Sequence, residues 1–99
     1  MAEHAAIVDI SRYYPAEGKR EELLGAMRRL AAAAAGSAGC FGAQACGSDQ
    51  DNAALIGISR WESKSALDSF ANAPDFVRER DQLKSLLARP AVREHFTPL

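Results

Sequence analysis

The segment CFGAQACGSDQDNAALIGISRW (residues 40–61) decides the fold, because it contains two extended stretches with only a polar loop between them. Gly, Ser, Asp and Asn dominate the loop at residues 47–52, and such residues between two apolar stretches predict a β-hairpin. The stretch after the loop carries large apolar side chains: Leu55, Ile56, Ile58 and Trp61. The segment therefore predicts a weaker strand at residues 40–46, paired with a stronger strand at residues 53–61.

The residues ahead of this hairpin predict a further strand and a helix. Residues 4–14 form the strand, and its apolar side chains lie on both alternating faces, as in a central strand that is covered on two sides. Residues 15–18 form a turn. Residues 19–35 predict a helix with one apolar stripe: Leu23, Met27, Leu30 and Ala34. The glycines of residues 36–39 end this helix.

The residues after the hairpin predict a broken helix and a short last strand. Ser63 is a good N-cap for a first helical piece, which residues 72–74 interrupt. Residues 76–88 form a second piece, and Pro90 prevents it from continuing. Residues 94–99 can make the last strand.

The resulting order of elements is strand, helix, strand, strand, broken helix, strand. This is the order of an α+β fold of ferredoxin-like βαββαβ type, an antiparallel sheet with its helices on one face. A chain of 99 residues is expected to form a single domain, residues 1–99. The other face of the sheet would be bare, although the first and third strands are apolar on both faces. Such a face indicates a partner surface, and a C2 homodimer formed through it is the simplest solution. A larger ring or a different partner stays open.

The composition argues against several classes of partner. The chain is 47% hydrophobic and 25% charged with a formal net charge of -1. It therefore lacks the basic excess that would indicate binding to nucleic acid. No apolar run approaches the ~20 residues of a membrane span, and the first residues lack the features of a signal peptide. A cytoplasmic location is therefore expected.

Cys40 and Cys46 would lie about 20 Å apart along one strand, so we expect two small unpaired thiols rather than a disulfide.

Two charged residues interrupt the apolar pattern. Arg80 falls in the middle of the inward stripe of residues 76–88. It either makes an ion pair or reaches water along its stem, or it is a pocket cation that holds a phenolate, enolate or carboxylate. Asp9 lies in the middle of the first strand. It either pairs with Arg60 or lies at the dimer interface, or it is a pocket base whose pKa burial would raise toward neutrality.

A set of short motifs runs through most of the chain: Gly39-Cys40-Phe41, Arg60-Trp61-Glu62-Ser63, Ala66-Leu67, Phe76, and the ending from Leu86-Leu87 to Pro98-Leu99. From Ile7 onward the sequence resembles the antibiotic biosynthesis monooxygenase domain, one of the dimeric α/β barrels. The resemblance implies a pocket between the sheet and the helices, with Trp61 in its wall. Some relatives oxidise quinols or polycyclic aromatic phenols with molecular oxygen and use no metal or flavin, so the resemblance implies no cofactor.

One branch of this family binds and degrades haem, and its iron ligand is a histidine on the helix after the tryptophan. No histidine occurs here between Trp61 and Phe76, so haem is not expected. His4 and His95 would open the first and last strands of an antiparallel pair and would lie at its opposite ends. No metal site is therefore expected. His4 is expected at the surface, and His95 either lies there or lines the mouth of a pocket.

Two functions remain open from the sequence. In the first, the protein is a cofactor-independent monooxygenase that oxidises a small phenol or quinol with molecular oxygen. Its substrate-binding residues would be Trp61, Arg80, Phe70 and Phe76. Arg80 would hold the oxyanion and Asp9 or His95 would move the proton, while Tyr13 and Tyr14 pack at the rim. In the second, a homodimer binds a small anionic aromatic molecule without chemistry, since acid–base groups are few.

Overall fold

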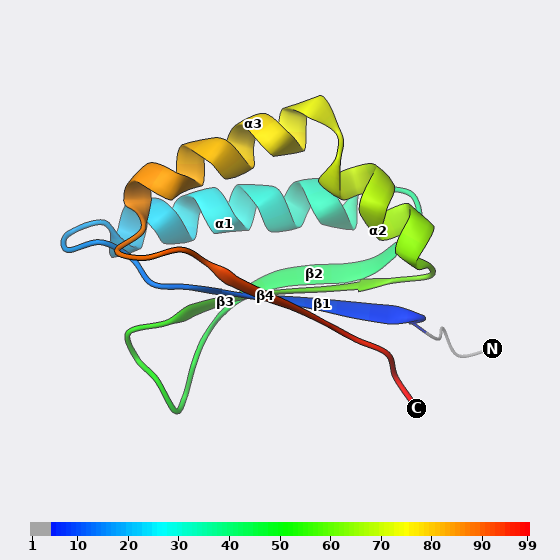
Figure 1. Ribbon diagram of the computed structural model, residues 1–99, viewed down its shortest axis with the longest axis horizontal. Helices are drawn as coiled ribbons and strands as arrows, with labels where there is room; N and C mark the ends of the chain where they lie inside the picture. Colours follow the sequence, from blue (N-terminus) through cyan, green and yellow to red (C-terminus); the bar gives the residue numbers. More distant parts are fainter. Residues whose placement is uncertain (1–4) are drawn as a thin grey trace.

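The computed structural model describes residues 5–99, which form an antiparallel sheet with its helices on one face (Figure 1). The elements in chain order are β1 (Ile7–Tyr13), α1 (Arg20–Ala35), β2 (Cys40–Gly47), β3 (Leu55–Trp61), α2 (Lys64–Ala71), α3 (Pro74–Leu83), the 3₁₀ turn η1 (Lys84–Leu86) and β4 (Val92–Phe96). The strand order across the sheet is β2-β3-β1-β4. The predicted α+β ferredoxin-like fold is confirmed.

The β2–β3 hairpin forms as its sequence predicts, and its polar loop bonds to its own backbone. The Asp51 N–H donates to Ser48 Oγ at 3.1 Å, and the Ala53 N–H donates to Asp51 Oδ1 at 3.1 Å. These bonds satisfy loop groups that have no partner in the sheet ladder. At the other end, a bulge between Cys40 and Gly42 shifts the register of β2. Both cysteines are free thiols, as expected.

The core lies between the sheet and the helices in two clusters. One cluster joins α1 to the C-terminal helical segment: Leu23, Ala26, Met27, Leu55, Leu83 and Leu86. The other joins β1 and β3 to α1 and α2: Ile7, Ala34, Trp61 and Leu67. Within the predicted stripe of α1, Leu23, Met27 and Ala34 are buried, and Leu30 packs partly buried against the first cluster.

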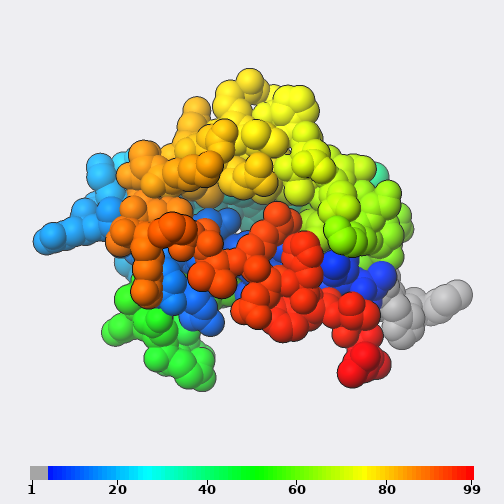
Figure 2. All heavy atoms as spheres, viewed as in Figure 1, coloured from blue at the N-terminus to red at the C-terminus, as the bar shows by residue number. Residues whose placement is uncertain are grey.

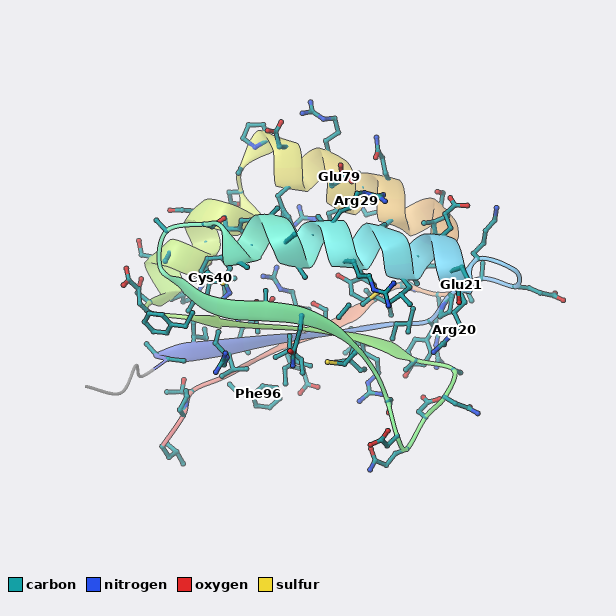
Figure 3. The ribbon with its side chains drawn as sticks, turned by 180° about the vertical axis from the view of Figure 1, so that it is seen from behind. Arg20, Glu21, Arg29, Cys40, Glu79 and Phe96 are labelled. Atoms are coloured by element: carbon teal, nitrogen blue, oxygen red, sulfur yellow. The ribbon has the colours of Figure 1, made fainter. Side chains whose placement is uncertain are left out.

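The alternation of the strands decides which side chains face the helices. Ile7 and Ser11 lie on the helix-facing side of β1 and are buried, and Asp9 shares that side because successive side chains alternate. The even-numbered positions of β1 and their cross-strand partners face the other way, and this open face carries these apolar side chains: Val8, Ile10, Ile56, Ile58, Val92 and Phe96. Figure 3 shows Phe96 beneath the sheet, on the side away from α1 and α3.

The C-terminal elements differ from the prediction. The second helical piece begins at Pro74 and ends at Leu83, earlier than the predicted residue 88, and η1 follows it. The reason is a competing set of backbone bonds to the end of β1: Ala16 N–H donates to the Leu86 carbonyl and Ala88 N–H donates to the Tyr14 carbonyl, each at 2.8 Å.

The strand boundaries also change the place of one histidine. The last strand is Val92–Phe96 rather than residues 94–99, so His95 lies near its end, opposite Asp9, and not at its start. The first strand is Ile7–Tyr13 rather than residues 4–14. His4 lies outside the described residues.

Gly39 is the glycine whose replacement we expect to be most costly. Its φ is +81°, and a Cβ there would lie 2.6 Å from the Ala66 Cβ. Gly18 has a similar φ of +75° but nothing within 4 Å, which makes it a matched control. Gly18→Ala should cost about 1 kcal/mol of unfolding free energy from backbone strain alone. Gly39→Ala should cost about 2 kcal/mol or more, because overpacking adds to the strain.

Urea unfolding of the two variants checks this expectation. Equal losses at both positions would show that the contact between the Gly39 turn and α2 relaxes at no cost.

Candidate functional site

A cavity of about 90 Å³ lies between the helix-facing side of the sheet and the helices. Helix α1 supplies apolar atoms to its wall: Met27, Leu30, Ala31 and Ala34. The polar part of the wall comes from the strands and α3: Asp9, Ser11, Tyr13, Ser59, Arg80 and Arg93. Charged groups in such a place need partners or a ligand. Polar groups that converge on an apolar cavity are typical of a binding site.

Two phenyl rings, stacked on each other, form one part of the wall. Phe70 and Phe76 both line the cavity, and their rings stack with centroids 4.5 Å apart. Trp61 lies behind Phe70, with ring centroids 5.4 Å apart, and is fully buried. Its indole N–H donates to Ser59 Oγ at 2.8 Å. Trp61 does not line the cavity, so it supports Phe70 and is not in place to stack on a ligand.

The Asp9 side chain is part of the cavity wall and makes two contacts with β4. Its Oδ1 accepts from Arg93 Nε at 2.7 Å and lies 3.0 Å from His95 Nε2. The Asp9 side chain is only 13% exposed, against 35% for Arg93 and 36% for His95. The shielded carboxylate of Asp9 is therefore in contact with an imidazole, that of His95, which reaches solvent.

The suggested pairing of Asp9 with Arg60 does not form. Asp9 stands opposite Ser59 in the β1–β3 register, and Arg60 lies one position further on, toward the open face. There the Arg60 guanidinium covers Gly42 of β2, with Nη2 2.6 Å from where a Cβ would be. Alternation of side chains along β3 separates Arg60 from Asp9.

Arg80 reaches the cavity from α3. It is half-buried, and its guanidinium carbon lies 5.5 Å from the centroid of the Phe76 ring, a cation–π distance. Within residues 5–99, Arg80 makes no hydrogen bond or ion pair with another side chain, so the ion-pair alternative is not what the structure shows. A guanidinium stays charged under these conditions and presents a fork of N–H donors that matches an oxyanion.

Tyr13 contributes a phenol that the sequence did not assign to the site. It was expected to pack at the rim, but it lines the cavity beside Arg80. Burial raises the pKa of its phenol above the usual value of 10.0. The Asp9 carboxylate raises this pKa further, whereas the Ser11 hydroxyl and the nearby cations lower it. Tyr13 is therefore a neutral hydrogen-bond donor at neutral pH.

The cavity brings together most of the residues that the sequence proposed. Asp9, Arg80, Phe70 and Phe76 line it, and His95 touches Asp9 without lining it. Ser11, Tyr13 and Arg93 are additions that the sequence analysis missed. Period-two alternation could have found the first two, because residues 9, 11 and 13 share one face of a strand. Arg93 could not be found, because its place depends on the pairing of β4 with β1.

Within residues 5–99, three or more metal-ligating side chains nowhere come together. In the same part of the chain, no helix combines the length and the apolar character that crossing a bilayer requires.

Known proteins share this fold over nearly the whole length of the chain. The family model described as antibiotic biosynthesis monooxygenase matches residues 6–81. The structure of Rv0793 from Mycobacterium tuberculosis has a TM-score of 0.86 and 25% sequence identity, over 94% of each chain. PA3566 from Pseudomonas aeruginosa has a TM-score of 0.83 and 22% identity, over 100% of this chain and 99% of its own.

A solved structure described as an antibiotic biosynthesis monooxygenase has a TM-score of 0.82 and 14% identity, over 94% of this chain and 98% of its own. At such identities the likeness shows the fold. No curated protein sequence matches this chain.

The raised pKa of Tyr13 leads to an expected alkaline titration. Tyr13→Phe should remove a phenolate absorbance component that titrates above pH 10.0 in the native wild type. Because the folded-state pKa is raised, the stabilising contribution is full below the unfolded pKa and is lost as pH rises through the folded pKa. Wild type should therefore lose more unfolding free energy than Tyr13→Phe above pH 10.0. A titration that is the same in both proteins, apart from amplitude, would contradict the burial of this phenol.

Proposed function

Because this chain belongs to the antibiotic biosynthesis monooxygenase family, which its match over residues 6–81 shows, we propose that it is a cofactor-independent monooxygenase that oxidises a small aromatic phenol or quinol with molecular oxygen. The single observation that carries the proposal is the cavity in which Asp9, Arg80 and the stacked phenyl rings of Phe70 and Phe76 meet. A base, an unpaired cation and an aromatic wall are what activation of a phenol requires.

In this proposal Asp9 takes the phenolic proton. Its Oδ1 is held by Arg93 and His95, and its Oδ2 makes no hydrogen bond within the described residues 5–99. That second oxygen is free for a substrate hydroxyl. His95, whose Nε2 lies 3.0 Å from Oδ1 and whose side chain is 36% exposed, passes the proton on to solvent.

Arg80 holds the phenolate that remains, and Phe70 and Phe76 hold its ring. An electron-rich phenolate can give one electron to molecular oxygen, after which the two radicals combine at a ring carbon that carries hydrogen, and the peroxide anion so formed takes up one proton to become a hydroperoxide. Loss of water from the resulting hydroperoxide gives the quinone. In sum, one phenol and one O₂ give one quinone and one H₂O, so the substrate supplies both electrons that the second oxygen atom needs. Tyr13 donates a hydrogen bond to the oxygen that becomes negative.

A second candidate function has its own support. The proposed base Asp9 already makes an ion pair with Arg93 at 2.7 Å, which is also what a purely structural carboxylate does. A cavity in which only Arg80 is free would bind a small anionic aromatic molecule and leave it unchanged. The alternative is therefore a non-catalytic binding homodimer.

Both candidate functions involve a homodimer. The open face of the sheet carries apolar side chains across three of its strands, and Val92 and Phe96 on this face are 51% and 46% exposed. Apolar surface of this kind favours burial against a partner. We propose that a second copy of this chain covers it, sheet against sheet, about a twofold axis.

Oxygen uptake by the purified, metal-free protein tests the catalytic proposal. We expect turnover of hydroquinones or polycyclic phenols above autoxidation. Asp9→Asn should lower the rate about 100-fold or more, the usual contribution of a general base. Arg80→Ala should lower it too, and should abolish the thermal stabilisation by ligand.

The matched control is Arg78→Ala, which removes an exposed arginine of the same helix that pairs with Asp75. Its rate should equal that of wild type. Absence of uptake across the whole panel, together with a ligand-induced rise in melting temperature that needs Arg80, would replace the monooxygenase by the binding homodimer.

Light scattering after gel filtration tests the homodimer. Ile10→Glu places a carboxylate in the middle of the open face, opposite Glu94, and should raise the dimer dissociation constant at least about 100-fold, since a buried unpaired charge is costly. Ala33→Glu, on an exposed position of α1, serves as the control and should stay dimeric. A wild type that is monomeric at high concentration would refute this interface.

A further inference from the structure

A second, larger cavity adjoins the one described above. Its volume is about 600 Å³, and it lies between the α3–η1 segment and β4. The two cavities share four lining residues: Ser11, Tyr13, Arg80 and Arg93. Figure 2 shows a hollow at this place, between the yellow and orange spheres of the helical segment and the red spheres of β4. The two cavities therefore adjoin along these residues, and we call the first the inner cavity, because it lies between the sheet and the helices, and the second the outer cavity.

Among the described residues 5–99, the outer cavity is lined by four cations and by no acidic residue. The four cations are Arg80, Lys84, Arg89 and Arg93. The chain as a whole has 12 Lys and Arg against 13 Asp and Glu, so composition alone would not produce such a set. Like charges around one cavity repel one another, and an anion between them relieves the repulsion.

Two of these cations are not neutralised within residues 5–99. Lys84 pairs with Asp81 at 3.1 Å, and Arg93 pairs with Asp9 at 2.7 Å. Arg80, in contrast, lies over the Phe76 ring. Arg89 likewise lies over an aromatic ring, that of Tyr14, at 3.6 Å from its guanidinium carbon to the centroid. An aromatic face holds a guanidinium in place and leaves its N–H donors free for a ligand.

The backbone around Arg89 is also held in position. The Ala88 N–H donates to the carbonyl oxygen of Tyr14 at 2.8 Å, and Pro15 and Leu87 form a β-bridge. Pro90 restricts the backbone of Arg89, the residue before it. A cation on such a segment loses less conformational freedom on binding than one on a free loop.

The volumes indicate how a ligand would occupy the two cavities. Ligand pockets usually measure about 300–1,000 Å³. The inner cavity, at about 90 Å³, is too small to hold a whole molecule of that class, whereas the outer one, at about 600 Å³, is not. A ligand whose ring is at the inner wall must therefore extend outward. The outer cavity offers such a ligand apolar atoms of Leu83 and Leu87 together with the cations.

We infer that the substrate is an amphipathic anion, with an aromatic ring in the inner cavity and an acid group, carboxylate or phosphate, held in the outer cavity by Arg89 and by Lys84, which exchanges its solvent-exposed contact with Asp81 for the ligand. This rests on the proposed function and adds the substrate class to it. Arg80, which both cavities share, separates the reacting oxyanion from the remote acid group. The remote group fixes which end of the molecule reaches Asp9.

Matched probes that differ only in charge test this inference. We would titrate 6-hydroxy-2-naphthoate and its neutral amide, 6-hydroxy-2-naphthamide, and follow the fluorescence of Trp61, the single tryptophan of the chain. The acid should bind about tenfold tighter or more than the amide, because charge-assisted hydrogen bonds are the strong ones. Its advantage should shrink as salt is raised, since exposed charges are screened.

The variant that carries the test is Arg89→Gln combined with Lys84→Gln. It should reduce the preference for the acid to about threefold or less and leave the affinity for the amide unchanged. Arg28→Gln combined with Arg29→Gln, two exposed positions of α1, is the matched control and should keep the full preference. A further pair, 2-naphthoate and 2-naphthyl phosphate, distinguishes the two acid groups, and the tighter binder names the one that the site takes.

The outcomes separate this inference from the proposed function. Equal binding of the acid and the amide by wild type would overturn the inference, and so would an unchanged preference in the double variant. Neither result touches the oxidation of a neutral hydroquinone, which needs neither Arg89 nor Lys84. Conversely, a preference for the acid that depends on Arg89 and Lys84 supports the inference, even where no probe consumes oxygen. In that case only the proposed oxidation fails.

Discussion

Strand β1 is hydrogen-bonded to β3 along one edge and to β4 along the other, so two neighbours determine the face that each residue of Ile7–Tyr13 presents. A slip of one residue would exchange the faces. Val8 and Ile10 would then lie under the helices, and the side chains that line the cavity would point away from them. Burial of Ile7 with Trp61 and Leu67 in one core cluster opposes such a slip. Both cavities depend on this register.

Two polar groups beneath the helices, the Trp61 indole and the Asp9 carboxylate, have partners within the protein. The indole of Trp61 donates to Ser59, and Asp9 is held by β4. Such pairing lowers the cost of placing polar atoms in a core. Arg80 differs, because within residues 5–99 only the face of an aromatic ring supports its charge. A cation that the fold shields but does not neutralise is suited to an anion from outside, and this is why the candidate functions share a ligand of negative charge.

Membership of the family establishes the fold and suggests the type of chemistry, but one fold serves many substrates. The choice of substrate must therefore come from residues of this chain. The inner cavity, with Asp9, Tyr13 and the two phenyl rings, has the groups for chemistry on a ring, whereas the outer cavity has mostly cations and apolar atoms. A division of this kind allows binding energy from a remote acid group to orient the reacting end.

The order of the elements, the hairpin at residues 40–61 and the apolar stripe of α1 could be predicted from the amino-acid sequence, because each depends on periodicity and turn chemistry between near neighbours. That Asp9 and Arg80 interrupt the apolar pattern could be seen as well, since a charge in such a pattern is visible without a structure. The partners of these charges could not. Arg93 and His95 reach Asp9 only because β4 pairs with β1, more than eighty residues apart in sequence. The displacement of Trp61 from the cavity wall by Phe70, and the meeting of Arg89 with Tyr14, likewise follow from how the elements pack, and packing is decided by long-range contacts that no local pattern records.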